Sequence, residues 1–96
     1  MVRLRIKRRL TTIFIVNGVD VHVEAAAGYT LKYSRNIALE DSNNTGRPFD
    51  EWEIHNDAGQ SLNPNKSLVD NNLVDGSRVF LNLKVGAGGI GGLAYA

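Results

Sequence analysis

The glycines near the end of the chain are the residues whose type and spacing could carry chemistry. The segment "VGAGGIGGLAYA", residues 85–96, holds two glycine pairs, Gly88-Gly89 and Gly91-Gly92. Glycine has no side chain to bury and loses the most backbone freedom on ordering, so this segment cannot build a core. It is either a loose chain end or a segment that another protein grips. A phosphate-binding loop is excluded, because no Lys-Ser/Thr pair or helix follows the glycines.

The titratable residues give no second chemical signal. His22 and His55 are the two histidines, they lack metal-ligand spacing, and the chain has no cysteine. Solvated strand positions are the better interpretation of both histidines. Asp50, Glu51 and Glu53 lie beside His55 and favour a solvent-facing acidic stripe, with a docking stripe for a basic partner left open. We therefore expect no catalytic residue, no metal and no cofactor.

The composition is that of one small globular domain. The chain has 96 residues, of which 43% are hydrophobic and 22% charged, a balance that suits one domain with a small core. No apolar run is long enough to span a bilayer, and the N-terminal segment lacks the long apolar stretch of a secretory signal. We expect a cytoplasmic protein with no membrane partner.

Basic residues are concentrated at the beginning of the chain. Residues 1–10, "MVRLRIKRRL", hold five of the eleven Lys and Arg residues and no acid. This predicts a solvated N-terminal arm that is dispensable for folding. Because Val2, Leu4 and Ile6 alternate with basic residues, an added edge strand is the alternative. The arm has no aromatic residue to stack on bases, which argues against a nucleic-acid partner.

The segment "TTIFIVNGVDVHVE" predicts a β-hairpin around Asn17-Gly18. A two-residue turn would place Phe14 and Val16 together on one face of the hairpin. A bulged turn would instead give one face to five β-branched residues. We favour the bulged turn, so Phe14 and Val16 are expected to point outward. The five aligned residues are then Ile13, Ile15, Val19, Val21 and Val23.

The remaining elements follow in a simple order. A helix is expected after Thr30 as N-cap, with a stop and loop at residues 41–48. Trp52 and Ile54 lie in a second hairpin with a short return strand, and "SRVFLNLKV" is a half-buried last strand. This order predicts a mixed sheet with one helix crossing one face. The expected core is Ile13, Ile15, Val21, Val23, Leu31, Trp52, Ile54, Leu68, Leu81 and Leu83.

Three segments resemble the ubiquitin-like family in order and spacing. These are "TIFIVNGVDVHVE" for the opening hairpin, "EIHNDAGQSL" for the middle hairpin, and "NKSLVDNNLVDGSRVFLNLKVGAGG" for the last strand and diglycine tail. The chain is also similar to small bacterial ubiquitin-like proteins that travel with dedicated activating and conjugating enzymes. The resemblance covers residues 11–89. It implies an α+β ubiquitin-like β-grasp domain over residues 11–85, after a basic arm at residues 1–10 and before a flexible glycine-rich tail at residues 86–96.

The resemblance implies a protein modifier that supplies substrate rather than catalytic groups. Its C-terminal carboxylate would react with ATP on an activating (adenylating) enzyme and pass through a conjugating enzyme to a target protein. The tail must thread a narrow channel, where side chains at Gly88 or Gly89 would block close backbone approach. An extended tail also offers its backbone groups as an added strand in a partner's groove.

A processing peptidase would first have to expose the reactive carboxylate. We expect it to cut between Gly89 and Ile90 and to remove residues 90–96. The alternative is a cut between Gly92 and Leu93, because Gly91-Gly92 is also a diglycine.

Several features depart from the family's pattern. The diglycine does not end this sequence, and Gly86 and Ala87 replace the arginines that precede it in ubiquitin. The exposed aliphatic recognition patch has no obvious counterpart, because Ile54 is expected to point inward with Trp52, so receptors for ubiquitin should bind poorly. Two other classes stay open: a sulfur carrier with a C-terminal thiocarboxylate, and a plain β-grasp interaction domain.

Overall fold

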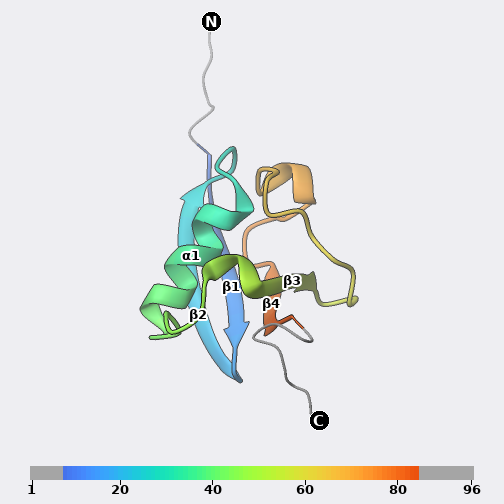
Figure 1. Ribbon diagram of the computed structural model, residues 1–96. Helices are drawn as coiled ribbons and strands as arrows, with labels where there is room; N and C mark the ends of the chain where they lie inside the picture. Colours follow the sequence, from blue (N-terminus) through green and yellow to red (C-terminus); the bar gives the residue numbers. More distant parts are fainter. Residues whose placement is uncertain (1–7, 85–96) are drawn as a thin grey trace, which may run out of the picture.

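The computed structural model describes residues 8–84, which form one mixed sheet crossed by one helix (Figure 1). The sheet order is β2-β1-β4-β3, with β1 and β4 parallel in the middle and antiparallel pairs on both sides. This confirms the predicted α+β arrangement. The elements are β1 (Arg9–Val16), β2 (Val19–Ala26), α1 (Leu31–Asp41), the 3₁₀ turn η1 (Phe49–Glu51), β3 (Trp52–Asn56), the 3₁₀ turn η2 (Val69–Asn71) and β4 (Arg78–Leu83).

The first hairpin has a two-residue turn, so the predicted bulged turn is wrong. Asn17 and Gly18 both have positive φ, 52° and 79°, and Val16 pairs directly with Val19. Asparagine tolerates the left-handed conformation, which permits the turn type whose twist matches that of the flanking strands. In this register Phe14 and Val16 face the helix and are 0% and 1% exposed.

The register also corrects the predicted core. Ile13 and Ile15 are half-buried on the sheet face opposite α1, and Leu83, at the end of β4, is 41% exposed. Val21 is half-buried and packs against the core. The predicted return strand is reduced to one isolated bridge between His55 and Ser61. Burial is confirmed for Val23, Leu31, Trp52, Ile54, Leu68 and Leu81.

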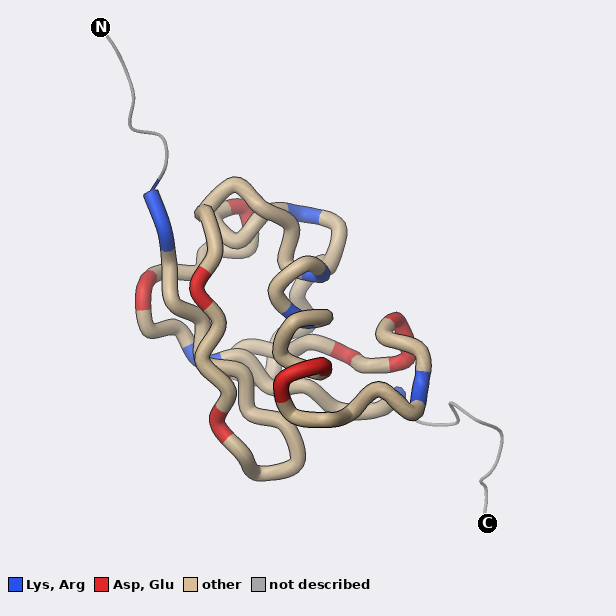
Figure 2. The backbone as a smooth tube through the Cα atoms, turned by 90° about the vertical axis from the view of Figure 1, so that its left-hand side faces the viewer, with Lys and Arg blue, Asp and Glu red and all other residues tan. Residues whose placement is uncertain are grey.

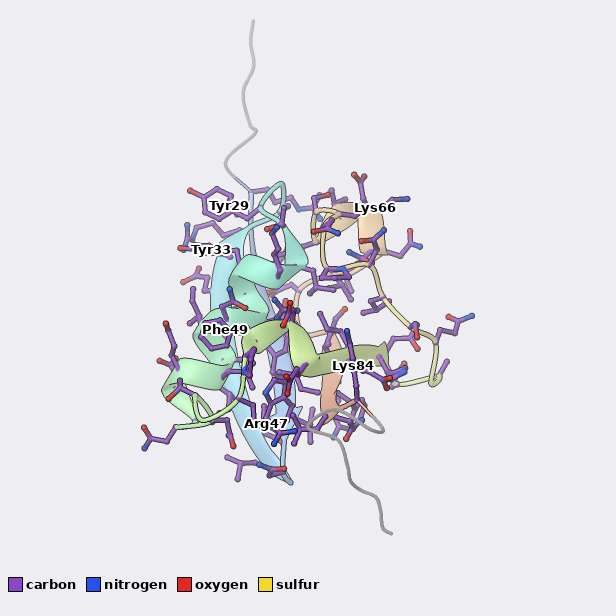
Figure 3. All side chains as sticks on the ribbon, in the orientation of Figure 1. Tyr29, Tyr33, Arg47, Phe49, Lys66 and Lys84 are labelled. Atoms are coloured by element: carbon purple, nitrogen blue, oxygen red, sulfur yellow. The ribbon has the colours of Figure 1, made fainter. Side chains whose placement is uncertain are left out.

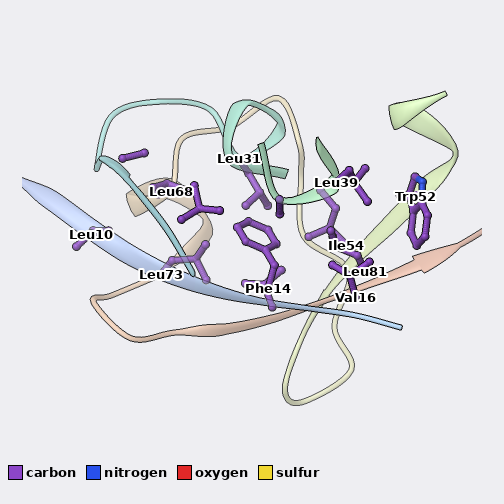
Figure 4. Close-up of a cluster of buried hydrophobic side chains, with 14 residues drawn as sticks. Leu10, Phe14, Val16, Leu31, Leu39, Trp52, Ile54, Leu68, Leu73 and Leu81 are labelled. Atoms are coloured by element: carbon purple, nitrogen blue, oxygen red, sulfur yellow. The ribbon is translucent and has the colours of Figure 1, made fainter. Parts of the chain in front are cut away.

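Phe14 lies at the centre of the core (Figure 4). The fully buried side chains of Leu31 and Leu39 from α1, and of Leu68 from the segment before η2, surround it. A fully buried leucine or phenylalanine stabilises a fold by roughly 1.5–3 kcal/mol relative to an exposed one. The cluster therefore holds the helix, the sheet and the long connection together.

The start of α1 is held by a distant segment of the chain. Thr30 is the N-cap in an extended conformation, but its side chain makes no capping hydrogen bond. Instead, the N–H groups of Leu31 and Lys32 donate to the carbonyl oxygens of Lys66 and Pro64, at 2.8 and 2.9 Å. These bonds satisfy donors that a helix start leaves free. They also fix the 63–67 segment beside the helix.

The first strand begins earlier than the predicted domain boundary. Residues 9 and 10 belong to the predicted basic arm, but they pair with β2, Arg9 with Ala26 and Leu10 with Ala25. Leu10 is 3% exposed and belongs to the core. These two residues are therefore part of the sheet, whereas residues 1–7 lie outside the described range.

We expect Leu10→Ala to lower the free energy of unfolding by about 2–5 kcal/mol, because it removes a buried leucine. The matched control is Arg9→Ala, whose side chain is 55% exposed and forms a surface ion pair with Glu24. Such pairs contribute about 1 kcal/mol or less. Urea unfolding curves measure both, and equal midpoints would show that Leu10 is not part of the core.

Candidate functional site

The residues predicted to carry processing and transfer lie outside the described residues. These residues are Gly88, Gly89, Ile90, Gly91, Gly92 and Leu93. The structure does describe the strand that leads to them. β4 runs between β1 and β3, and the N–H of Lys84 donates to the carbonyl of Glu51 at 2.8 Å. The described chain is thus anchored to the domain up to Lys84.

The sheet face opposite α1, here called the open face, carries an apolar strip that the sequence analysis missed. Ile13 and Ile15 of β1 lie beside Arg78 and Phe80 of β4, and Phe80 pairs with His55 of β3. Ile13, Ile15, Phe80 and His55 are half-buried. The Asn17-Gly18 pair could have predicted this face from the sequence. A two-residue turn fixes the register of the hairpin, and the register decides which alternate residues point away from the helix.

Charged groups border the apolar strip on the open face. The guanidinium carbon of Arg78 lies 5.6 Å from the centroid of the Phe80 ring, within cation–π range. His55 Nε2 is 3.8 Å from a carboxylate oxygen of Glu53. An apolar centre with a polar border is typical of surfaces that contact other proteins.

The predicted acidic stripe is only partly formed. Glu53 and His55 share the open face as expected, but Glu51 belongs to η1 and pairs with Arg47, at 3.1 Å from its Nε. Across residues 8–84, acidic and basic residues are scattered rather than gathered in one patch (Figure 2). The middle-hairpin residues Ile54 and Trp52 point inward, as predicted.

Other kinds of site find no support in the described part of the chain. No group of three or more potential ligands there could hold a metal ion. Within the same residues, no helix is long and apolar enough to cross a membrane. A cavity of about 530 Å³ lies between the loop after β3 and η2. Its Asn71 amide donates to the carbonyls of Asn63 and Ser67, so this polar group serves the loop itself.

Comparison with known proteins gives a family and a fold. Residues 6–89 match the family model described as "Protein of Unknown function (DUF2604)". An uncharacterized protein of Sinorhizobium fredii is 33% identical over 81 residues, which are 84% of this chain and 62% of that protein. The chain therefore spans less than two thirds of the length of this relative.

Two solved structures share the arrangement of the elements. The ubiquitin of Caldiarchaeum subterraneum has a TM-score of 0.66 at 17% identity, covering 88% of this chain and 100% of that one. The EccD5 ubiquitin-like domain of Mycobacterium xenopi has a TM-score of 0.64 at 20% identity, covering 79% and 94%. The fold is the ubiquitin-like β-grasp.

Proposed function

We propose that this chain, which belongs to the DUF2604 family of proteins of unknown function, is a ubiquitin-like protein modifier. In this proposal its C-terminal carboxylate is activated by adenylation and then transferred to target proteins by activating and conjugating enzymes. The observation that supports the proposal most is the path of the chain. β4, a central strand of a ubiquitin-like sheet, ends at Leu83, and the sequence reaches the Gly88-Gly89 pair a few residues later.

The spacing between the domain and the glycines suits transfer chemistry. Gly89 is the fifth residue after Lys84, so an extended segment would reach at most roughly 17 Å beyond the anchored chain. That reach is enough to enter a partner's channel while the domain stays on its surface. Glycine allows the close backbone approach that such a channel requires.

We place the cut of the processing peptidase between Gly89 and Ile90, which removes residues 90–96. A cut after Gly92 would move the carboxylate three residues farther from the domain that the activating enzyme grips. The carboxylate oxygen would then attack the α-phosphorus of ATP, which forms an acyl-adenylate and releases pyrophosphate. A thiol displaces the adenylate, and an amine or hydroxyl of the target displaces the thiol.

The open face is the surface by which we expect the activating enzyme to hold the domain. Ile15 and Phe80 lie next to each other there and are half-buried by their neighbours. Covering the rest of their apolar area would contribute about 25 cal/mol per Å² before the costs of association. This surface leaves the end of β4 free to deliver the tail.

The test is the remnant that trypsin leaves on an acceptor. The full-length chain with an N-terminal tag is expressed in its native host, and tagged species larger than the free chain are isolated and digested. Trypsin cuts after Lys84, so a modifier that ends at Gly89 leaves residues 85–89 on the acceptor residue.

Other masses of the remnant or of the free chain would indicate a different cut or a different function. A remnant of residues 85–92 would move the cut to Gly92. A free chain that ends at Gly89 with one oxygen replaced by sulfur would identify a sulfur carrier instead. An uncut chain without conjugates would contradict the proposal and leave a plain interaction domain.

A further inference from the structure

A groove beside α1 has a buried cation at its floor. Arg35 is 5% exposed, yet no carboxylate among the described residues forms an ion pair with its guanidinium. Within residues 8–84, its one hydrogen bond runs from Nε to the side-chain oxygen of the adjacent Asn36, at 3.0 Å. A guanidinium has five N–H donors. The terminal nitrogens of Arg35 are not sealed from solvent, so their donors are accessible to a ligand in the groove.

The positive charge of Arg35 is permanent. Burial lowers the pKa of Arg35, and the exposed carboxylate of Asp50 partly opposes this effect. The ordinary pKa of arginine is so high that the side chain stays charged at neutral pH. The groove therefore holds a fixed cation that no carboxylate of residues 8–84 neutralises through an ion pair.

Two cavities meet at this cation. One has a volume of about 490 Å³ and the other about 240 Å³, and both are lined by Arg35, Asp50 and Pro64. Lys32 lines the larger cavity, and Lys84 and Glu53 line the smaller one. The groove therefore carries three cations against the carboxylates of Asp50 and Glu53, and this excess of positive charge favours an anionic ligand.

The smaller cavity is also lined by the tryptophan. Trp52 is 5% exposed, and its buried indole Nε1 has no hydrogen-bond partner among residues 8–84. The walls are partly apolar, with Phe49 in the larger cavity and Leu62 in the smaller one. Figure 3 shows Phe49 beside α1 and Lys84 beside β3 on the same side of the molecule.

We propose that this groove binds an extended acidic segment of a partner protein, with an Asp or Glu carboxylate at the Arg35 guanidinium. A carboxylate matches the planar fork of arginine, and such charge-assisted bonds are about twice as strong as neutral ones. A peptide also brings apolar side chains for the walls that Phe49 and Leu62 form. A simple anion supplies the charge and lacks these side chains.

The proposal does not depend on the chemistry of the tail. The groove lies on the helix side of the sheet, whereas the apolar strip with Ile15 and Phe80 lies on the open face. A partner could therefore occupy the groove while another protein holds the open face. Failure of the peptide test would leave the proposed modifier function untouched, and the converse also holds.

The single tryptophan of the chain makes a direct test possible. The indole N–H of Trp52 gives one identifiable cross-peak in a proton–nitrogen correlation spectrum. The full-length protein is titrated with the blocked peptide acetyl-Leu-Glu-Leu-amide at millimolar concentrations. We expect a saturable shift of this cross-peak and of the Arg35 amide. The peptide with glutamine in place of glutamate should produce a response at least about tenfold weaker, because it lacks the charge.

Substitutions in the groove test whether the peptide-induced shift comes from binding there. Arg35→Met should weaken binding of the acidic peptide about tenfold or more, because the charged fork is removed. The melting temperature should change little, since Arg35 forms no ion pair among the described residues. Asp50→Asn should tighten binding by removing a repelling carboxylate. Lys66→Met is the matched control, since Lys66 lines the 530 Å³ cavity instead of the groove.

Three results would overturn the proposal. One is the absence of any shift with the acidic peptide, and another is an equal response to the glutamine peptide. The third is the same response from acetate or inorganic phosphate alone, which would make the groove a site for free anions. Should Arg35→Met fail to fold, Arg35→Lys replaces it, since lysine keeps the charge but loses the fork.

Discussion

Replacing Gly89 with alanine is expected to abolish both processing and transfer while the domain folds normally. Gly89 follows the last strand in the sequence and is not part of the described core, so we expect the variant to leave the fold of residues 8–84 unchanged. In the proposed mechanism the methyl group meets the walls of the peptidase and activating-enzyme channels, which approach the backbone closely. The measurement is the intact mass of the chain and of its conjugates in the native host, beside the melting temperature of the purified variant.

The second glycine pair supplies the matched control for this experiment. Gly92→Ala adds the same methyl group three residues later, inside the segment that the proposed cut removes. It should leave transfer intact and affect processing less than Gly89→Ala does. If Gly92→Ala abolishes transfer and Gly89→Ala preserves it, the cut lies after Gly92 and our placement is wrong.

Phe14→Ala is expected to lower the free energy of unfolding by about 3–5 kcal/mol. Phe14 is 0% exposed at the centre of the core, so the truncation removes apolar burial and leaves a cavity between β1 and α1. Native domains have stabilities of about 5–15 kcal/mol, so a loss of this size would remove most of the stability of a domain at the lower end of that range.

Phe80→Ala makes the same chemical change on the opposite face of the sheet. Phe80 is half-buried, and its contacts include the cation–π contact with Arg78. We expect a loss of about 1.5 kcal/mol or less. Urea unfolding of the two variants under one set of conditions makes the comparison. Equal losses would contradict the assignment of Phe14 to the buried face and Phe80 to the open face.

The order of the elements could be predicted from the sequence because each has a local signal. Asn17-Gly18 marks the hairpin, and Thr30 marks the helix start. The buried face of β1 has no such local signal, since Phe14 and Ile15 are both strongly apolar and lie on opposite faces of the strand. One residue of difference in turn length exchanges the two faces of a strand, which is why the predicted core failed at Ile13 and Ile15.

The groove around Arg35 shows a different limit. The sequence places Arg35 on or near the apolar stripe of the helix, but the residues that cover it come from far along the chain. Pro64 and Leu62 belong to the connection after β3, and Lys84 follows the last strand. No local pattern contains such a cluster. The groove can be found only from the fold. The proposed chemistry of the tail residues, in contrast, rests on their sequence and on the channel of a partner enzyme.

The pairing of β1 with β4 has a consequence for how the chain is made. The first strand cannot complete its ladder until residues 78–83 have been synthesised, since they form one of its two neighbours. Contacts so far apart in sequence slow folding. A nascent chain stopped before β4 would expose one edge of β1, a strand rich in Ile, Phe and Val, and such edges recruit other chains. We therefore expect chains truncated before residue 78 to aggregate rather than to accumulate as folded domains.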